Sequence, residues 1–222
     1  MSRSCASGLP LIHPRSSNSA DLAEADPPIV LASASPRRLE LLLQIGLSPR
    51  VWVSQVPESR LSGESPRAYT ERVARAKALA ATEHFADAVV IGADTVVALD
   101  AEILGKPRDR SDAARMLRAL SGREHEVFSA VAVWRAGRML SSVSRSQVHF
   151  GALSEAGIAA YCDTGEPDDK AGGYGIQGRA AVFITELRGS YSGVVGLPLF
   201  ETAELLRQHR IELLNHAGSD RL

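Results

Sequence analysis

Residues 29–40 read IVLASASPRRLE and decide how the fold begins. The first five of them, residues 29–33, form a short apolar run typical of a buried strand. Ser35 and Pro36 follow as a helix cap and a first-position proline, and Gly46 stands where that helix should stop. The sequence therefore predicts a strand, a tight turn and a helix in immediate succession.

Strand and helix patterns alternate along the rest of the chain. Further strands are predicted over 51–53, 88–91 and 182–187, a turn near Asp100, and helices over 65–81, 111–120, 154–165 and from Pro198 onward. Residues 126–134 and 139–150 are also strand-like, and they meet around Gly137. That arrangement predicts a hairpin, and therefore antiparallel pairing beside parallel strands. We predict an α/β fold with a mixed sheet.

Composition limits the kinds of partner. The 222 residues carry a net charge of -1, so the chain as a whole does not attract polyanions, and we expect a small ligand with no nucleic acid and no membrane partner. The sequence has no apolar run long enough for a membrane span and only two cysteines, Cys5 and Cys162. A disulfide framework or a zinc cluster is therefore not expected, and a cytoplasmic location fits best.

Residues 1–26 differ in composition from the rest of the chain. They are rich in Ser, Ala and Asp and contain a single short apolar cluster around Leu11. Such a segment cannot offset its ordering entropy by burial. We predict a disordered N-terminal extension over 1–26 and one folded domain over 27–222.

The first candidate site is the turn Ser33-Ala34-Ser35-Pro36-Arg37-Arg38. Free backbone N–H groups and the positive end of the helix dipole favour an oxyanion there, and guanidinium groups can add bidentate contacts. Taken one at a time, these residues would equally be an ordinary cap followed by surface arginines. Their clustering at a strand-to-helix turn favours phosphate binding.

The second candidate is Asp94, which follows the predicted strand 88–91. A carboxylate beyond the end of a strand can hold a divalent cation or accept a proton from water, although an aspartate that only shapes a turn would look the same. Glu58, Lys77 and Lys106 add the acid and the cations that triphosphate chemistry requires. Each of these three alone would be an unremarkable surface charge.

The third candidate is the glycine-rich segment 165–178, which contains DKAGGYGIQG over 169–178. Its glycines formally match a dinucleotide fingerprint, but a polar loop precedes them and a strand follows, which is the wrong context. The glycines can instead let the backbone approach a ligand to which Lys170 and Gln177 present their side chains. A flexible surface loop is the alternative.

Together these segments resemble the Maf family of nucleotide pyrophosphatases from about Ile29 to Leu206. The similarity is carried by Ser33-Ala34-Ser35-Pro36-Arg37-Arg38, Gly92-Ala93-Asp94-Thr95, Gly105-Lys106-Pro107-Arg108, residues 169–178, and Gly196-Leu197-Pro198-Leu199. The resemblance implies an elongated central sheet flanked by helices, two lobes around a cleft, and a homodimer. It also implies hydrolysis of a nucleoside triphosphate to the monophosphate and pyrophosphate, with Mg²⁺ or Mn²⁺ as cofactor.

The resemblance assigns roles to particular residues. Asp94 would accept the proton and, with Glu58, bind the metal, while Lys106 would assist catalysis. The remaining positions would bind substrate or set its specificity: Ser33, Arg37, Arg38, Lys77, Thr95, Lys170 and Gln177. Gln177 together with Asp169-Lys170 resembles the dTTP and UTP type, since an amide offers both a donor and an acceptor to a pyrimidine edge. The alternative is a nucleotide-binding regulator of cell division and septum formation without significant turnover.

Overall fold

The computed structural model describes residues 27–213, so the predicted disordered extension at 1–26 lies outside the described residues, as do 214–222. The strands are β1 Ile29–Ala32, β2 Arg50–Trp52, β3 Val89–Leu99, β4 Glu102–Leu104, β5 Glu124–Arg135, β6 Arg138–Phe150 and β7 Ile184–Arg188. The helices are α1 Pro36–Gln44, α2 Pro66–Thr82, α3 Arg110–Leu120, α4 Glu155–Cys162, α5 Tyr191–Val195 and α6 Leu199–Gln208, with short 3-10 turns η1 Ala171–Gly173 and η2 Arg179–Phe183.

The seven strands form one mixed sheet in the order β2-β1-β3-β5-β6-β7, with β4 paired to β3. β1 runs parallel to β2 and β3, and the remaining pairs are antiparallel, which confirms the predicted mixed sheet. The predicted hairpin is also confirmed: Ala136 and Gly137 both have positive φ in the turn that joins β5 to β6. The predicted turn near Asp100 joins β3 to β4.

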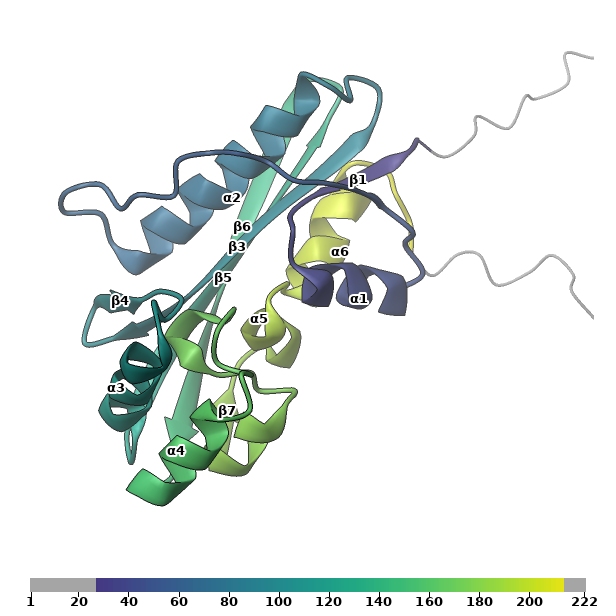
Figure 1. The fold of residues 1–222 in the computed structure, drawn as a ribbon. Coiled ribbons are helices and arrows are strands. Elements are labelled where there is room, and N and C mark those ends of the chain that lie inside the picture. The colour runs from purple at the N-terminus through teal and green to yellow at the C-terminus, as the bar shows by residue number, and fades with distance from the viewer. Residues whose placement is uncertain (1–26, 214–222) are drawn as a thin grey trace, which may run out of the picture.

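Three long strands, β3, β5 and β6, run through the whole molecule (Figure 1). α2 packs on one face of them. The opposite face is covered in two parts, by α1, α5 and α6 around one end and by α3 and α4 around the other. These two groups of elements lie around opposite ends of the long strands, so the molecule has the two lobes that the resemblance implied.

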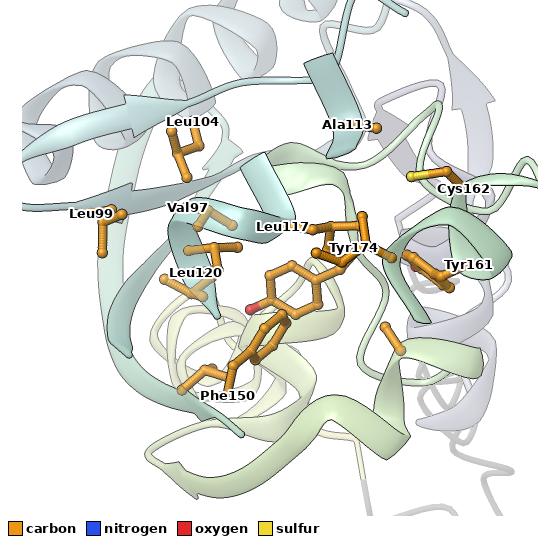
Figure 2. Packing of buried hydrophobic residues seen from close by; sticks show 14 residues of the cluster. Val97, Leu99, Leu104, Ala113, Leu117, Leu120, Phe150, Tyr161, Cys162 and Tyr174 are labelled. Carbon is orange, nitrogen blue, oxygen red and sulfur yellow. The ribbon is translucent and has the colours of Figure 1, made fainter. Parts of the chain in front are cut away.

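The alternation of side chains along β3 explains how one strand serves three apolar clusters. Val90, Val96 and Ala98 point toward α2, whereas Ile91 packs with α1 and α6, and Val97 packs with α3. Figure 2 shows the cluster around Val97, in which aromatic rings and aliphatic side chains from α3, α4 and the glycine-rich segment fill the space against the sheet. Burial on both faces explains why β3 is apolar along nearly its whole length.

Several predicted boundaries are wrong. β3 does not end at Ile91 but continues to Leu99, because residues 90–98 pair without interruption with β5. Asp94 therefore lies within a strand. α3 begins at Arg110 with Asp109 as its cap, and β7 begins at Ile184 because residues 179–183 form a 3-10 turn. The short elements β4 and α5 were not predicted at all.

Candidate active site

A gap along one edge of β3 creates the candidate site. β1 pairs with β3 only as far as Gly92, and β4 pairs with it only from Val97 onward. Between these points the edge of β3 opens into a cleft of about 630 Å³ that lies between the lobes. The cleft is lined by all ten of the predicted site residues: Ser33, Arg37, Arg38, Glu58, Lys77, Asp94, Thr95, Lys106, Lys170 and Gln177.

The open edge also explains why neighbouring residues of one strand both line the cleft. Asp94 and Thr95 project from opposite faces of the sheet, as successive strand residues do. If another strand were paired with this edge of β3, a cavity on one face of the sheet could reach only one of these two side chains. Here the missing partner leaves both side chains accessible from the edge.

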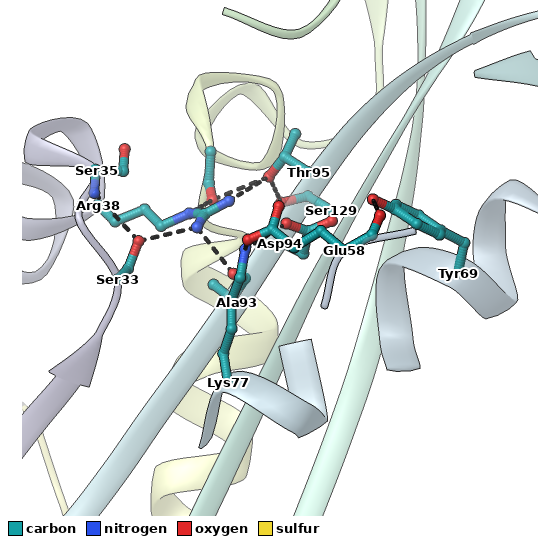
Figure 3. Close-up of polar contacts among 11 residues, drawn as sticks. Ser33, Ser35, Arg38, Glu58, Tyr69, Lys77, Ala93, Asp94, Thr95 and Ser129 are labelled. Atoms are coloured by element: carbon teal, nitrogen blue, oxygen red, sulfur yellow. Dashed lines mark hydrogen bonds and ion pairs between the residues drawn. The ribbon is translucent and has the colours of Figure 1, made fainter. Parts of the chain in front are cut away.

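Two carboxylates and one lysine meet at the bottom of the cleft (Figure 3). Lys77 Nζ lies 2.9 Å from Asp94 Oδ1 and 2.9 Å from Glu58 Oε1. Asp94 and Lys77 are buried, whereas Glu58 is about half exposed. Burial raises the pKa of the Asp94 carboxyl, and the nearby charges of Lys77 and Arg38 oppose that increase. A raised pKa brings a carboxylate closer to the range in which it can take a proton from water.

Gly92 allows the Asp94–Lys77 contact to form. A Cβ atom at Gly92 would collide with the carbonyl of Ala74 and would lie 2.6 Å from the backbone nitrogen of Ala78. α2 therefore packs directly on the backbone of β3 at this point. Since Lys77 lies on the same turns of α2, this close packing brings its Nζ within reach of the Asp94 carboxylate.

Arg38 binds three of the segments that line the cleft. Its guanidinium donates to the carbonyls of Gly196 and Ala93 at 2.9 and 2.8 Å, and to Ser33 Oγ at 3.0 Å. A longer contact of 3.4 Å reaches Thr95 Oγ1. Burial lowers the pKa of Arg38. Most of the N–H groups of Arg38 are thus bound to other residues of the protein. These bonds hold the turn after β1, the open edge of β3 and the end of α5 in place relative to one another.

Ser35 is the N-cap residue of α1, as the sequence predicted, but it does not cap the helix through its side chain. Instead, Ser33 Oγ accepts the Ser35 N–H at 3.2 Å. This bond tightens the turn, so that the start of α1 and the hydroxyl of Ser33 both line the cleft.

A second ion cluster connects the lobes across the mouth of the cleft. Arg37 on α1 donates to Asp169 Oδ2 at 2.7 Å, and Lys170 Nζ lies 2.7 Å from Asp169 Oδ1. Burial acts to raise the pKa of Asp169, but its hydrogen bonds from Lys170 and Arg37 outweigh that effect and hold the pKa at about 2. Lys170 also donates to the carbonyl of Glu166 at 2.7 Å.

Lys106 and Gln177 line the cleft, and their side chains make no hydrogen bond with the described part of the chain. Lys106 lies on the loop after β4, which is tied to the glycine-rich segment by the hydrogen bond from Gly172 N to Gly105 O at 3.0 Å. Lys106 and Gln177 are both exposed. Both side chains are therefore available to a ligand in the cleft, as the sequence analysis expected of Gln177.

Two polar residues of the site, Tyr69 and Ser129, were not predicted, and Asp169 was predicted only as part of a motif. Tyr69 lines the cleft from α2, Ser129 on β5 lies 2.9 Å from Thr95 Oγ1, and Asp169 makes the ion pairs at the mouth. The sequence held a signal for Tyr69: it precedes Lys77 by about two turns of one predicted helix, which places both residues on the same side of that helix. Ser129 carried no comparable signal, since only strand pairing brings it to Thr95.

The fold and the cleft define a class of protein: a two-lobed α/β protein whose interlobe site has five basic side chains and three carboxylates, and which is suited to a small polyanion. Residues 28–209 match the family model of the Maf-like proteins, and the chain belongs to that family. It is 51% identical over 193 residues to the dTTP/UTP pyrophosphatase of Bordetella pertussis. That alignment covers 82% of this chain and 93% of the relative. The dTTP/UTP pyrophosphatase of Vibrio cholerae is 52% identical over 181 residues, with 81% and 97% covered.

A solved structure of a HAM1 protein from Coxiella burnetii aligns with 81% of this chain and 98% of its own, at 16% identity and a TM-score of 0.46. Within the described residues, no helix combines the length and the apolar character needed to cross a membrane.

Proposed function

We propose that the chain hydrolyses dTTP and UTP to the nucleoside monophosphate and pyrophosphate. The observation that carries the proposal is the buried Asp94 carboxylate on the open edge of β3, paired with Lys77 in a cleft rich in basic side chains. The choice of pyrimidine triphosphates is supported by the names of the Bordetella and Vibrio relatives. Each of these relatives is covered over most of its length by this chain.

The basic residues are placed to take the phosphates. A triphosphate carries close to four negative charges, which must be compensated before water can approach phosphorus. Lys106 has no partner among the described residues, and Arg37 and Lys170 can exchange Asp169 for phosphate oxygens at the mouth of the cleft. The open start of α1 and the hydroxyl of Ser33 add hydrogen-bond donors at the same place.

Asp94 is assigned the proton-accepting role. Its carboxylate is fixed by Lys77, and its raised pKa favours proton transfer from water more than an exposed aspartate would. In the proposed reaction, water oxygen bonds to the α-phosphorus as the bond between that phosphorus and the bridging oxygen breaks. The water proton passes to Asp94, and the leaving pyrophosphate is compensated by the basic side chains.

The carboxylates also fit a divalent cation. Asp94 Oδ1 and Glu58 Oε1 both bind Lys77 Nζ at 2.9 Å, which brings the two carboxylates together and leaves the second oxygen of each one for a cation. No group of three or more His, Cys, Asp or Glu residues within 27–213 could hold a metal by itself. This set suits Mg²⁺ or Mn²⁺, since Mg²⁺ is commonly bound by one or two carboxylates together with substrate phosphates. When bound, the cation would neutralise phosphate charge.

Gln177 is assigned to the recognition of the base. Gln177 presents an amide that has no partner among the described residues, and it can pair with the N3–H and a carbonyl of uracil or thymine. Thr95 and Arg37 are proposed to contribute to specificity as well. Thr95 acts through the packed network with Ser129 and Gly196, to which its hydroxyl is bound at 2.9 and 3.1 Å.

A pyrophosphate-release screen over dTTP, UTP, CTP and 7-methyl-GTP, with and without Mg²⁺, tests the proposal. Steady release from dTTP and UTP that depends on metal is expected. Tight binding of one equivalent without release would instead support a nucleotide-binding regulator of cell division. The cytoplasmic location and the homodimer remain parts of the proposal, and light scattering on the purified protein tests the second.

A further inference from the structure

Glu58 lies on a segment that has no secondary structure of its own. Residues 53–65 connect β2 to α2 without a helix or strand, and residues 57–63 are exposed to solvent. Nevertheless, the Glu58 carboxylate reaches Lys77 at the bottom of the cleft. An exposed loop of this length would sample many positions unless the protein restrained it.

Tyr69 supplies the first restraint. Its hydroxyl donates a hydrogen bond of 2.7 Å to the backbone carbonyl of Glu58, as Figure 3 shows. This bond acts on the backbone of the very residue whose side chain enters the site.

Arg72 supplies the second restraint. Its Nε and Nη2 atoms bind the two oxygens of Glu64 at 2.7 and 2.8 Å, and Nη2 also donates to the carbonyl of Ser59 at 2.9 Å. Glu64 in turn accepts the backbone N–H of Leu61 at 3.1 Å. The Glu64 side chain is only 9% exposed, and the Arg72 guanidinium lies 5.5 Å from the centre of the Tyr69 ring. These contacts form one cluster over the loop.

Both restraints come from the helix that also carries Lys77. Tyr69 and Arg72 are three residues apart and therefore lie on one side of α2. The helix is anchored to the sheet by the buried Val73 and Ala74 and is capped by Ser65. α2 thus presents the loop contacts and Lys77 from one rigid element.

We propose that Tyr69 and Arg72 are positioning residues that hold Glu58 at the metal-triphosphate site. The inference rests on the proposed function, because it takes Glu58 to share in binding the metal. Neither residue needs to touch the metal. Both act through the backbone of residues 58 and 59, so that the second carboxylate stands beside Asp94 before the substrate arrives. Such preorganisation reduces the ordering cost of binding.

The test uses the full chain, four single variants and one double variant, in which Arg72→Met is combined with Glu58→Gln. Arg72→Met removes the loop cluster, Tyr69→Phe removes one hydroxyl, and Glu58→Gln removes the carboxylate itself. Arg75→Met is the matched control, since Arg75 lies on the same helix and its contact is to Ser141 on β6 at 2.9 Å. The measurements are the Mg²⁺ concentration for half-maximal dTTP turnover and Mn²⁺ binding by electron paramagnetic resonance with a non-hydrolysable α,β-imido-dUTP.

We expect Arg72→Met to raise both metal constants about tenfold, as outer-shell substitutions commonly do, with turnover at saturating metal changed far less. Tyr69→Phe should raise them about two- to tenfold, the effect of one hydrogen bond. Arg75→Met should leave them unchanged. In the Glu58→Gln background, Arg72→Met should add almost nothing, because its route of action is already lost. If the effects of Arg72→Met and Glu58→Gln on the metal constants multiply in the double variant, the proposal is overturned. Metal constants that are unchanged in both Arg72→Met and Tyr69→Phe would also overturn it.

Hydrogen exchange of the loop separates this inference from the proposed function. Faster exchange of amides in residues 58–64 is expected in Arg72→Met but not in Arg75→Met, and unchanged exchange would overturn the inference. If the wild type releases no pyrophosphate, the proposed function fails. The loop restraint and the Mn²⁺ affinity can still be measured in that case.

Discussion

The guanidinium of Arg37 on α1 lies 2.7 Å from Oδ2 of Asp169, a residue 132 positions later on the glycine-rich segment. This ion pair links the two lobes across the mouth of the cleft. Asp169 also binds Lys170, so a single carboxylate occupies two cations that face the proposed phosphate site. A triphosphate must therefore compete with Asp169 for both of them.

Asp169→Asn should consequently strengthen the binding of α,β-imido-dUTP. Removing the competing charge is expected to lower its Kd by up to about fivefold, because exposed pairs are worth about 0–1 kcal/mol. Isothermal titration calorimetry at low salt measures the change. Asp168→Asn is the control, since Asp168 is also exposed but makes no ion pair within residues 27–213. Weaker binding by Asp169→Asn alone would mean that the carboxylate orients Arg37 for the ligand and does not compete with it.

Asp94→Asn should lose turnover without loss of the fold. The amide cannot accept a proton, so a fall of about a hundredfold or more in kcat is expected. Burial raises the folded-state pKa of Asp94, so the folded state favours its protonated form, and its contribution to stability declines as pH rises from the ordinary value of 3.8 through the folded pKa. The uncharged Asn variant should therefore melt no lower than the wild type at pH 7.

Two further measurements examine the same assignment. For the wild type, kcat/KM should fall on the acid side at a pH above the ordinary range of an aspartate, because the free enzyme must hold Asp94 ionised. Chelation of the divalent metal should abolish activity. Near-normal turnover of Asp94→Asn, or full activity in excess chelator, would show that the proposed chemistry is wrong.

Gln177→Glu should change the choice of base. A carboxylate placed against the carbonyl oxygens of thymine or uracil leaves a polar contact unpaired, at a cost of about 1–3 kcal/mol, or roughly 5- to 150-fold in kcat/KM. Because Gln177 is exposed in the free protein, the substitution should not alter the melting temperature. Pyrophosphate binding should also be unaffected.

The comparison uses kcat/KM for dTTP, UTP, CTP and 7-methyl-GTP, with Gln208→Glu on α6 as the control, since that residue is exposed and does not line the cleft. An unchanged ranking and unchanged rates in Gln177→Glu would show that this side chain does not read the base.

His125 should make stability depend on pH. It is buried, its Nε2 lies 2.8 Å from the Tyr174 hydroxyl, and burial lowers its pKa to about 4. Its folded-state pKa is below the unfolded value of 6.5, so the unfolded state binds more protons between these pH values. The stability from this group is complete above pH 6.5 and should be lost as pH falls to about 4, by roughly 3 kcal/mol.

His125→Gln, which does not titrate in this range, should remove most of that dependence. Urea unfolding of both proteins at pH 7.5, 6 and 5 measures it. The same slope in the two proteins would assign the acid sensitivity to other groups.

The sequence alone determined the local elements and the chemical character of the site. The apolar run before Ser33, the proline at the start of α1 and the glycine between the hairpin strands are local signals, and each one predicted its element. The ten candidate residues were found because clustered serines, basic residues and glycines suit phosphate, and because the segments resemble one family. All ten line one cleft.

Only the tertiary structure decided how those residues work together. The sequence could not show that Asp94 lies within β3, since that depends on where β1 stops pairing and where β4 begins. It could not show that Arg38 is used mainly on the protein, that Asp169 neutralises Arg37, or that Tyr69 holds the loop of Glu58. These contacts join residues that are 11 to 158 positions apart. Local propensity acts over a few residues, whereas contacts at such separations form only when strands pair and helices pack.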